Sequence, residues 1–256
     1  MRNTFRVSFF TRKGDDLMYK RVLLKLSGEA LKDSNAMQIL NVDHVNHLAK
    51  VMSDLHSKGV QLAVVIGAGN IWRGNLADGI GIERAPADYM GMMGTVMNAI
   101  AMSSALKKSG VDSVVFSAIP EIPSITVAYD SQKAIKAMEE GKVVFLAGGT
   151  GKPFYTTDTA ATMRALETNC EAIFMGKNGV EGVYDKDPTK NSDAKFIKTI
   201  SYQEIINKNL QIMDLSAVEL IKDKDIEIRI FSMSDPNNFI KVAMGEDIGT
   251  TCKKEK

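Results

Sequence analysis

Residues 22–31 read VLLKLSGEAL, and this stretch sets a pattern that recurs along the chain. Three apolar residues (22–24) are followed by Lys25, Ser27 and Gly28 at the end of the run. A short apolar run without polar alternation is typical of a strand buried on both faces, as in a parallel sheet. Ligands of such sheets bind beyond the carboxyl ends of the strands. The stretch therefore predicts a parallel α/β sheet with a candidate binding turn at its first strand.

The same alternation repeats through the rest of the chain. Further apolar runs of strand length lie at residues 62–66, 114–116, 143–146, 172–175 and 226–231. Helical patterns lie between them, at residues 42–57, 89–108, 132–140, 157–169 and 213–224. Repeated strand–helix alternation favours a three-layer, doubly wound α/β fold, with a mainly parallel sheet and helices on both faces. The polar segment 182–201 is instead predicted to be an exposed hairpin or loop.

Composition excludes several classes of protein. Of the 256 residues, 45% are hydrophobic and 25% are charged, an ordinary balance for a globular chain. Lysine and arginine total 32 against 31 acidic residues, so no single-sign field points to nucleic acid or an anionic membrane as a partner. No apolar run approaches the roughly 18 residues of a membrane-spanning helix. The two cysteines, Cys170 and Cys252, match no metal-ligand spacing and favour a reducing cytoplasm over a disulfide scaffold.

Residues 1–18 are predicted to be a disordered N-terminal extension. The apolar residues 7–10 form too short a run for a signal peptide, and charged residues follow at once. Met18 lies just before the first predicted strand, which makes it an alternative start. Residues 19–256 show no linker and no repeat, so we expect a single domain whose two ends form lobes around a cleft.

A second glycine-bearing turn, residues 67–74, follows the apolar run 62–66. Successive backbone N–H groups in such a turn form an anion nest. Arg73 lies four residues past Gly69, a spacing that lets its guanidinium reach the same phosphate. The spacing is neither a Walker A motif nor a dinucleotide fingerprint. The alternative to a phosphate site here is an ordinary glycine-rich turn with a solvated arginine. For the first motif, the alternative is that Lys25 is a surface lysine.

A third turn, residues 147–158, follows a predicted strand and opens a predicted helix at Thr157 or Asp158, both good N-caps. Its glycines, its hydroxyl groups and the helix N-terminus suit a phosphate or a ribose. Helix capping alone explains Asp158 equally well. Because three turns suited to phosphate follow strands of one sheet, a phosphate-binding function is nevertheless favoured over their occurrence by chance.

The fourth segment, residues 178–188, is more ambiguous. Tyr184 is suited to cover an aromatic base and Asp187 to bind a ribose hydroxyl, but the spacing alone favours a β-hairpin. His44 and His47 share one face of a predicted helix without an evident third ligand, so solvated positions are favoured over a metal site.

Taken together, the ordered motifs resemble those of the bacterial uridylate (UMP) kinases, which have the amino-acid-kinase fold. The resemblance covers about residues 19–251, nearly the whole chain. The first motif indicates only the broad fold family, whereas the ordered set points to the enzymes that act on UMP. The motifs that carry the resemblance are residues 25–31, 67–73, 88–92, 149–154, 156–158, 180–184, 187–188, 213–215 and 244–246.

The resemblance implies transfer of the γ-phosphoryl group of Mg-ATP to UMP, giving ADP and UDP, as a step of pyrimidine nucleotide biosynthesis. A phosphate acceptor has a second pKa of about 6, so it is largely dianionic at neutral pH and needs no strong general base. The implied catalytic residues are Lys25, Arg73 and Asp158; Asp158 orients Lys25, and Lys177 assists.

The resemblance also assigns the binding residues. The implied ATP-binding residues are Lys25, Leu26, Ser27, Gly28, Gly69, Arg73, Asn178, Tyr184 and Asp187. The implied UMP-binding residues are Ala68, Asp88, Thr150, Gly151, Lys152, Pro153, Phe154, Tyr155, Thr156 and Thr157, with Asp88 on the ribose hydroxyls. Mg²⁺ is implied as a cofactor that arrives with ATP, and no metal site built by the protein alone is expected. A homohexamer, feedback inhibition by UTP and a cytoplasmic location are further implications.

Three departures from the family pattern leave specific points open. Ala68 stands where relatives often have glycine, so its methyl group bears on the shape of the anion nest. Lys152 replaces an asparagine found in many relatives, which leaves its contact with the base open. Residues 32–38 lack the glycine-rich, acidic character associated with activation by GTP, so that activation is left open as well.

Two other functions remain as alternatives. One is a sister kinase of the same fold whose acceptor is a carboxylate or a carbamate, against which Asp88 and residues 150–158 argue. The other is a non-catalytic, nucleotide-binding regulator. The joint presence of Lys25, Arg73 and Asp158 argues against the regulator.

Overall fold

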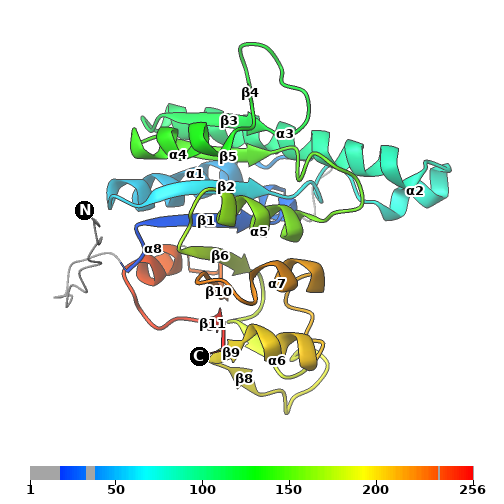
Figure 1. Cartoon of the computed structure of the whole chain (residues 1–256), viewed down its shortest axis with the longest axis vertical. Coiled ribbons are helices and arrows are strands. Elements are labelled where there is room, and N and C mark those ends of the chain that lie inside the picture. The colour runs from blue at the N-terminus through cyan, green and yellow to red at the C-terminus, as the bar shows by residue number, and fades with distance from the viewer. Residues whose placement is uncertain (1–17, 33–37, 236, 256) are drawn as a thin grey trace, which may run out of the picture.

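The computed structural model describes residues 18–32, 38–235 and 237–255. The predicted N-terminal extension therefore lies outside the described residues except for Met18, as do residues 33–37 of the segment considered for GTP activation. Among the described residues the central feature is a nine-stranded sheet in the order β4-β3-β5-β2-β1-β6-β10-β11-β9 (Figure 1). Its strands are β1 (Arg21–Leu26), β2 (Gln61–Ile66), β3 (Ser113–Ser117), β4 (Val127–Ala128), β5 (Val143–Ala147), β6 (Ala172–Lys177), β9 (Thr199–Ser201), β10 (Glu227–Ser232) and β11 (Thr250–Lys253).

The sheet is mainly parallel, as predicted. Every neighbouring pair from β4 to β10 is parallel, and only the β10–β11 pair is antiparallel. Helices cover both faces, which confirms the three-layer α/β prediction (Figure 1). One face carries α1 (Val42–Ser57), α3 (Arg84–Lys108) and α8 (Asn237–Ala243), and the other carries α4 (Ser131–Glu139), α5 (Thr157–Glu167), α6 (Tyr202–Asn207) and α7 (Leu215–Ile221).

The apolar run in β1 is buried on both faces, which is why it shows no polar alternation. Val22 and Leu24 pack into the core under α1, α3 and α8, whereas Leu23 packs into the core under α4 to α7. All three are at most 1% exposed. Full burial of such a side chain contributes about 1.5–3 kcal/mol, so the middle of the sheet is anchored from both sides.

The carboxyl ends of the central strands meet at one edge of the sheet. Leu26 is in register with Ile66 of β2, and Lys25 is in register with both Val65 of β2 and Met175 of β6. Since β2 and β6 flank β1 on opposite sides, the chain order reverses at β1. Open α/β sheets bind ligands at such a switch point.

Several helix boundaries differ from the sequence predictions. The long helix α3 begins at Arg84 rather than at residue 89, because Pro86 is tolerated in a first helical turn. This places Asp88 on a helix instead of in a loop. The helix predicted at residues 213–224 is shorter in the structure, at Leu215–Ile221. Several short elements were not predicted: α2 (Asn75–Ile80), α6, α8, β4, β9 and β11.

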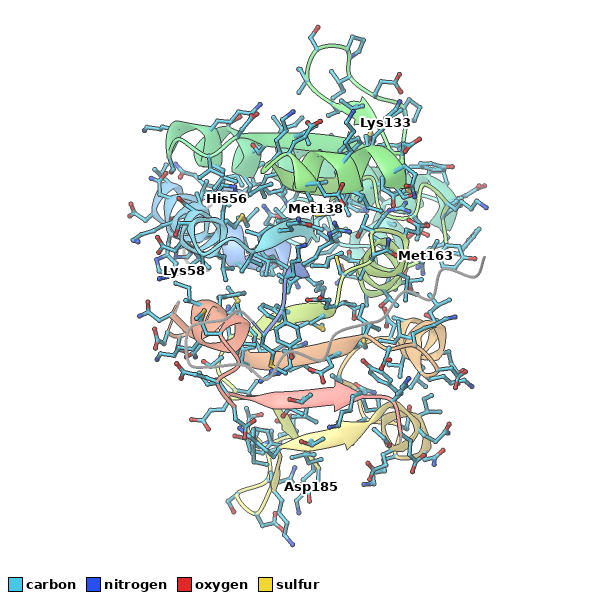
Figure 2. The ribbon with its side chains drawn as sticks, turned by 60° about the vertical axis from the view of Figure 1, so that its left-hand side comes forward. His56, Lys58, Lys133, Met138, Met163 and Asp185 are labelled. Carbon is cyan, nitrogen blue, oxygen red and sulfur yellow. The ribbon has the colours of Figure 1, made fainter. Side chains whose placement is uncertain are left out.

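The segment predicted as a hairpin or loop contains a hairpin, formed by β7 (Val183–Tyr184) and β8 (Phe196–Ile197). Figure 2 shows Asp185 of this hairpin at the opposite end of the molecule from Lys133 and Met138 of α4. The rest of the segment adds β9 to the large sheet, a contribution that its polar sequence conceals. Within the described ranges, no helix has both the length and the apolar character needed to cross a bilayer.

Candidate active site

Lys25 and Asp158 form an ion pair at the carboxyl edge of the sheet. The Lys25 Nζ lies 2.7 Å from Asp158 Oδ1, and the two side chains are only 18% and 17% exposed. The prediction of Thr157 or Asp158 as the N-cap of α5 is wrong: the cap is Thr156, whose hydroxyl accepts from the backbone N–H of Thr159. Asp158 is therefore free of the capping role, and its carboxylate is available to hold Lys25.

A second lysine lies close to this pair. The Nζ of Lys177, at the end of β6, donates to the carbonyl of Ile212 at 3.3 Å. Burial holds the pKa of Lys177 below its ordinary value, and the positive charge of Lys25 lowers that pKa further, while Asp158 acts in the opposite direction. Two amines and one carboxylate thus share one electrostatic environment, which suits a site that receives anions.

The turns after β1 and β2 are in direct backbone contact. A Cβ at Gly28 would lie 2.5 Å from the carbonyl oxygen of Gly67 and 2.8 Å from the backbone N of Gly69. Real Cβ atoms do not approach other atoms so closely, so only glycine fits there. Ser27 caps the short 3₁₀ helix Gly28–Leu31 by accepting from the N–H of Glu29 at 3.3 Å.

Arg73 is held by a carboxylate from the neighbouring turn. Its Nη2 and Nε atoms donate to Glu29 Oε1 at 2.5 and 3.2 Å, and its Nε also approaches the carbonyl of Gly69 at 3.3 Å. Partial burial acts to raise the pKa of Glu29, but the hydrogen bonds from Arg73 and Lys32 outweigh it and lower that pKa. The guanidinium therefore lies over the glycine turn before any phosphate is bound.

The methyl group of Ala68 is accommodated by a glycine on α3. Ala68 is 9% exposed, and a Cβ at Gly94 would come within 2.9 Å of the Ala68 Cβ. The missing side chain on the helix thus makes room for the extra methyl group on the turn. Alanine at this position is compatible with the close approach of α3 to the nest.

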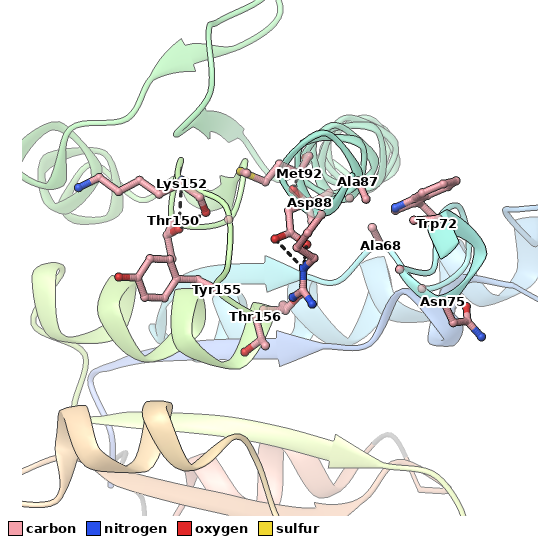
Figure 3. Close-up of a pocket in the computed structure, with 18 of the residues that line it drawn as sticks. Ala68, Trp72, Asn75, Ala87, Asp88, Met92, Thr150, Lys152, Tyr155 and Thr156 are labelled. Carbon is pink, nitrogen blue, oxygen red and sulfur yellow. Dashed lines mark hydrogen bonds and ion pairs between the residues drawn. The ribbon is translucent and has the colours of Figure 1, made fainter. Parts of the chain in front are cut away.

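A cavity of about 530 Å³ opens between the 67–74 turn, α3 and the turn after β5 (Figure 3). Of the predicted UMP-binding residues, Gly151, Pro153 and Phe154 do not line it, and Phe154 is 67% exposed. Thr157 also lines it, but it is not labelled in the figure. The labelled predicted residues around the cavity in Figure 3 are Ala68, Asp88, Thr150, Lys152, Tyr155 and Thr156.

The carboxylate of Asp88, which lines this cavity, accepts hydrogen bonds from two different parts of the chain. The backbone N–H of Phe154 donates to its Oδ2 at 2.7 Å, and the Nε of Arg84 donates to its Oδ1 at 2.9 Å. The side chain of Asp88 is only 17% exposed. Phe154, although it lies off the cavity, therefore helps to fix the carboxylate that faces it.

The predicted adenosine residues do not share one cavity. Tyr184 and Asp187 line a cavity of about 570 Å³ together with Lys177, whereas Asn178 borders a different hollow beside Glu29. Asp187 accepts from both the N–H and the hydroxyl of Thr189, which lowers its pKa.

Two residues of the site were not singled out from the sequence. Glu29 was quoted in the first motif without a role, since its partner Arg73 is distant in the chain. Arg84 lies four positions before Asp88, and this i,i+4 spacing on a helix was a signal available in the sequence. The two histidines predicted to be solvated, His44 and His47, border the hollow beside Asn178, and among the described residues no three His, Cys, Asp or Glu side chains gather as a metal-binding group.

Comparison with known proteins identifies the family. The model of the amino acid kinase family matches residues 20–232. The uridylate kinase of Mycoplasma capricolum subsp. capricolum is 50% identical over 225 residues, which cover 88% of this chain and 94% of that relative. The uridylate kinase of Mycoplasmopsis pulmonis is 45% identical over 229 residues, with 90% and 94% covered.

Solved structures agree with the sequence relatives. The crystal structure of UMP kinase from Bacillus anthracis superposes with a TM-score of 0.89 at 34% identity, covering 93% of this chain and 97% of that one. UMP kinase from Ureaplasma parvum gives a TM-score of 0.86 at 35% identity, covering 92% and 99%. The chain therefore belongs to the amino acid kinase family and, within it, to the uridylate kinases.

Proposed function

We propose that this protein transfers the γ-phosphoryl group of Mg-ATP to UMP, giving ADP and UDP for pyrimidine nucleotide biosynthesis. The similarity to uridylate kinases along nearly the whole chain supports the substrate pair. The observation that carries the reaction is the half-buried Lys25–Asp158 pair beside two touching glycine turns. This arrangement offers fixed cations and backbone amides where two phosphate groups have to meet.

Catalysis in this proposal is positioning combined with charge stabilisation. The acceptor phosphate is mostly dianionic near neutral pH because its second pKa is about 6, so no side chain has to remove a proton from it. Lys25 stabilises the charge that spreads over the passing phosphoryl group, and Asp158 keeps its ammonium in place. Arg73 binds phosphate oxygens on the other turn, and the lowered pKa of Lys177 fits an assisting role beside Lys25.

The side chains present are compatible with Mg²⁺ held mainly by the nucleotide. Magnesium in kinases is bound through substrate phosphates and one or two carboxylates, with waters completing the octahedron. Asp158 is the carboxylate at the phosphate edge, and Lys25 engages its Oδ1 while the N–H of Asp214 approaches its Oδ2 at 3.4 Å. When bound, the ion would neutralise the phosphate charge, and the protein's own contribution remains the orientation of Lys25 and Arg73.

The nucleosides are assigned to two separate regions. The cavity of about 530 Å³ would take UMP, with Asp88 accepting from the ribose hydroxyls and residues 150–157 enclosing the base and sugar. The region of Tyr184 and Asp187 would take the adenosine, with Asn178 reaching it only if the segment beside it shifts. Residues 25–28, Gly69 and Arg73 would bind the ATP phosphates between the two regions.

Assembly and regulation complete the proposal. A homohexamer is supported by apolar side chains exposed along α3, where Tyr89, Met93 and Met97 recur at helical spacing and are 42%, 52% and 50% exposed. UTP shares the uracil and ribose of UMP, so feedback inhibition by UTP is proposed to act at the UMP cavity. A cytoplasmic location, where both substrates are supplied, is also part of the proposal. Light scattering and UTP titration of the initial rate test the first two of these.

The decisive experiment measures ADP release from Mg-ATP with UMP, CMP, dUMP, acetylglutamate, aspartate and carbamate offered separately. Turnover confined to UMP is the expected result. Turnover with an acid or with carbamate would instead identify a sister kinase and remove the ribose role of Asp88. Nucleotide binding without turnover on any acceptor would identify a regulator.

A further inference from the structure

A pair of asparagine side chains is buried beneath the two phosphate turns. Asn70 is 7% exposed and Asn98, on α3, is fully buried. The Nδ2 of Asn70 donates to Asn98 Oδ1 at 3.0 Å, and the Nδ2 of Asn98 donates to Asn70 Oδ1 at 2.8 Å. Buried amides without partners are costly, so this mutual pairing keeps both side chains in one orientation.

The pair also touches both turns. The Nδ2 of Asn98 donates a second hydrogen bond, of 2.8 Å, to the carbonyl of Gly67, the first residue of the turn after β2. A Cβ at Gly28 would lie 2.4 Å from Asn70 Oδ1, so the backbone of the turn after β1 rests directly on the amide of Asn70. The separation between Gly28 and Gly67 is therefore set by a hydrogen-bonded unit with little freedom to adjust.

The position of the pair is informative because most of the residues packed around it are apolar. Neighbouring α3 residues such as Val96, Ala99 and Met102 are buried hydrocarbons. A polar pair of this kind adds direction, since its hydrogen bonds are satisfied in only one arrangement of α3 and the two turns. Its contacts lie at the place where the proposed donor and acceptor phosphates have to be brought into line.

We propose that Asn70 and Asn98 are positioning residues for phosphoryl transfer, which fix the distance between the turn that binds the ATP phosphates and the turn that binds the acceptor phosphate. This inference rests on the proposed function. In the proposed function the ATP phosphates contact residues 25–28 and also Gly69 and Arg73, whereas the acceptor phosphate approaches the second turn at Ala68. Either nucleotide can adjust to a small shift of the turns when it binds alone, but in-line transfer requires a fixed separation. Transfer needs both, and a displacement of about 1 Å in such a geometry costs on the order of 10²-fold in rate.

The test compares Asn98→Ala with Ser103→Ala. Ser103 lies five residues after Asn98 on the same helix and is also buried. Its hydroxyl pairs with that of Ser113 in β3 at 2.9 Å instead of with either glycine turn. We expect Asn98→Ala to lower kcat about 10- to 100-fold per folded molecule, while the Kd for ATP and for UMP, each measured alone by calorimetry, changes less than about threefold. Ser103→Ala is expected to lower the melting temperature without lowering kcat.

A second variant, Asn70→Ala, removes the other half of the pair and is used if Asn98→Ala misfolds. The kcat of each variant is calculated per nucleotide-binding site. Equal losses of kcat in Asn98→Ala and Ser103→Ala, or a loss explained wholly by weaker binding of one nucleotide, would overturn the inference. Failure of both asparagine variants to fold would also overturn it, because the pair would then serve folding. Wild-type protein is assayed alongside; if it is inactive on UMP, the proposed function itself has failed.

Discussion

The backbone N–H of Phe154 donates to Asp88 Oδ2 at 2.7 Å and so joins the turn after β5 to the helix α3, two of the elements that line the cavity proposed for UMP. Phe154 adopts a φ of +73°, which is unusual for a residue with a side chain. The strained backbone is stabilised by a charged acceptor, and the carboxylate is oriented in return. The relationship explains how a residue that misses the cavity still shapes the proposed ribose site.

Asp88→Asn is therefore expected to weaken UMP selectively. Loss of a charged acceptor for a sugar hydroxyl costs about 1.5–3 kcal/mol, so the KM for UMP should rise about 10-fold or more while the KM for ATP stays near the wild-type value. The preference for UMP over dUMP should shrink as well, because dUMP lacks one of the hydroxyls. Initial-rate kinetics with both acceptors measure these ratios.

Asp130→Asn is the matched control for that experiment. Asp130 also accepts one backbone N–H, from Lys133 at 2.9 Å, but it caps α4 and does not line the cavity. Its variant should keep the wild-type KM for UMP. An unchanged KM in Asp88→Asn would contradict the ribose assignment.

Lys25→Ala should remove most turnover while leaving the fold intact. Loss of one preorganised donor to a developing charge costs about 2.7–4 kcal/mol, or 10²–10³ in kcat. Asp158→Asn should cost less, because it leaves the ammonium in place but weakens the 2.7 Å contact that orients it. Rapid-quench measurement of UDP formation, with circular dichroism to verify folding, checks both variants.

Glu139→Ala tests whether the loss of any ion pair that involves β1 lowers kcat. Glu139 pairs with Arg21 at 3.2 Å at the opposite end of β1. Its variant should retain wild-type kcat, since it does not touch the phosphate edge. A Lys25→Ala enzyme within about threefold of wild type, against the 10²–10³ expected for a lost donor, would remove Lys25 from the catalytic set.

Glu29→Ala should lower activity only through Arg73. Arg73→Ala is expected to lower kcat by about 10²–10³, and Glu29→Ala, which leaves the guanidinium present but less ordered, by about 10-fold. The double variant should be no slower than Arg73→Ala alone, because the carboxylate then has no guanidinium to orient. Additive losses of kcat in this double-mutant cycle would show that Glu29 acts separately from Arg73. The control for loss of a surface carboxylate is Asp54→Ala, which breaks the surface ion pair of Asp54 with Lys50.

The fold was largely predictable because its central strands are buried on both faces. The run in β2, for example, is continuous from Leu62 to Ile66 and has no other stable placement. Strands β9 and β11, which end the sheet on one side, were missed because they are only three and four residues long, so neither sequence contains a continuous apolar run. Their place in the sheet is decided by tertiary pairing, of β11 with β10 and of β9 with β11.

The site was predictable where chemistry follows a strand end. Lys25 lies near the carboxyl end of β1, and Asp158 lies in the first turn of α5, the helix that follows β5. The parallel topology brings the two side chains together at the same edge of the sheet. The contact between Arg73 and Glu29 depends on how two loops approach each other, which local sequence does not encode. The separation of Asn178 from Tyr184 has the same origin, since the path of the intervening turn determines which hollow each residue borders.

Lys177→Met should stabilise the protein at neutral pH while slowing it. Burial lowers the pKa of Lys177 from its ordinary 10.5, so the unfolded chain binds this proton more tightly than the folded protein does. The charged Lys177 therefore lowers the free energy of unfolding by its full amount below the folded-state pKa. This loss of stability disappears as the pH rises toward 10.5. The gain in melting temperature from Lys177→Met should accordingly be largest at pH 7 and should vanish near pH 10.5, whereas kcat at pH 7 should fall. Lys133→Met, at an exposed position on α4, should show neither the pH-dependent gain nor the loss of rate. A destabilised Lys177→Met protein with a pH-independent deficit would mean that the hydrogen bond to Ile212, rather than a charge held for the phosphates, is what this lysine supplies.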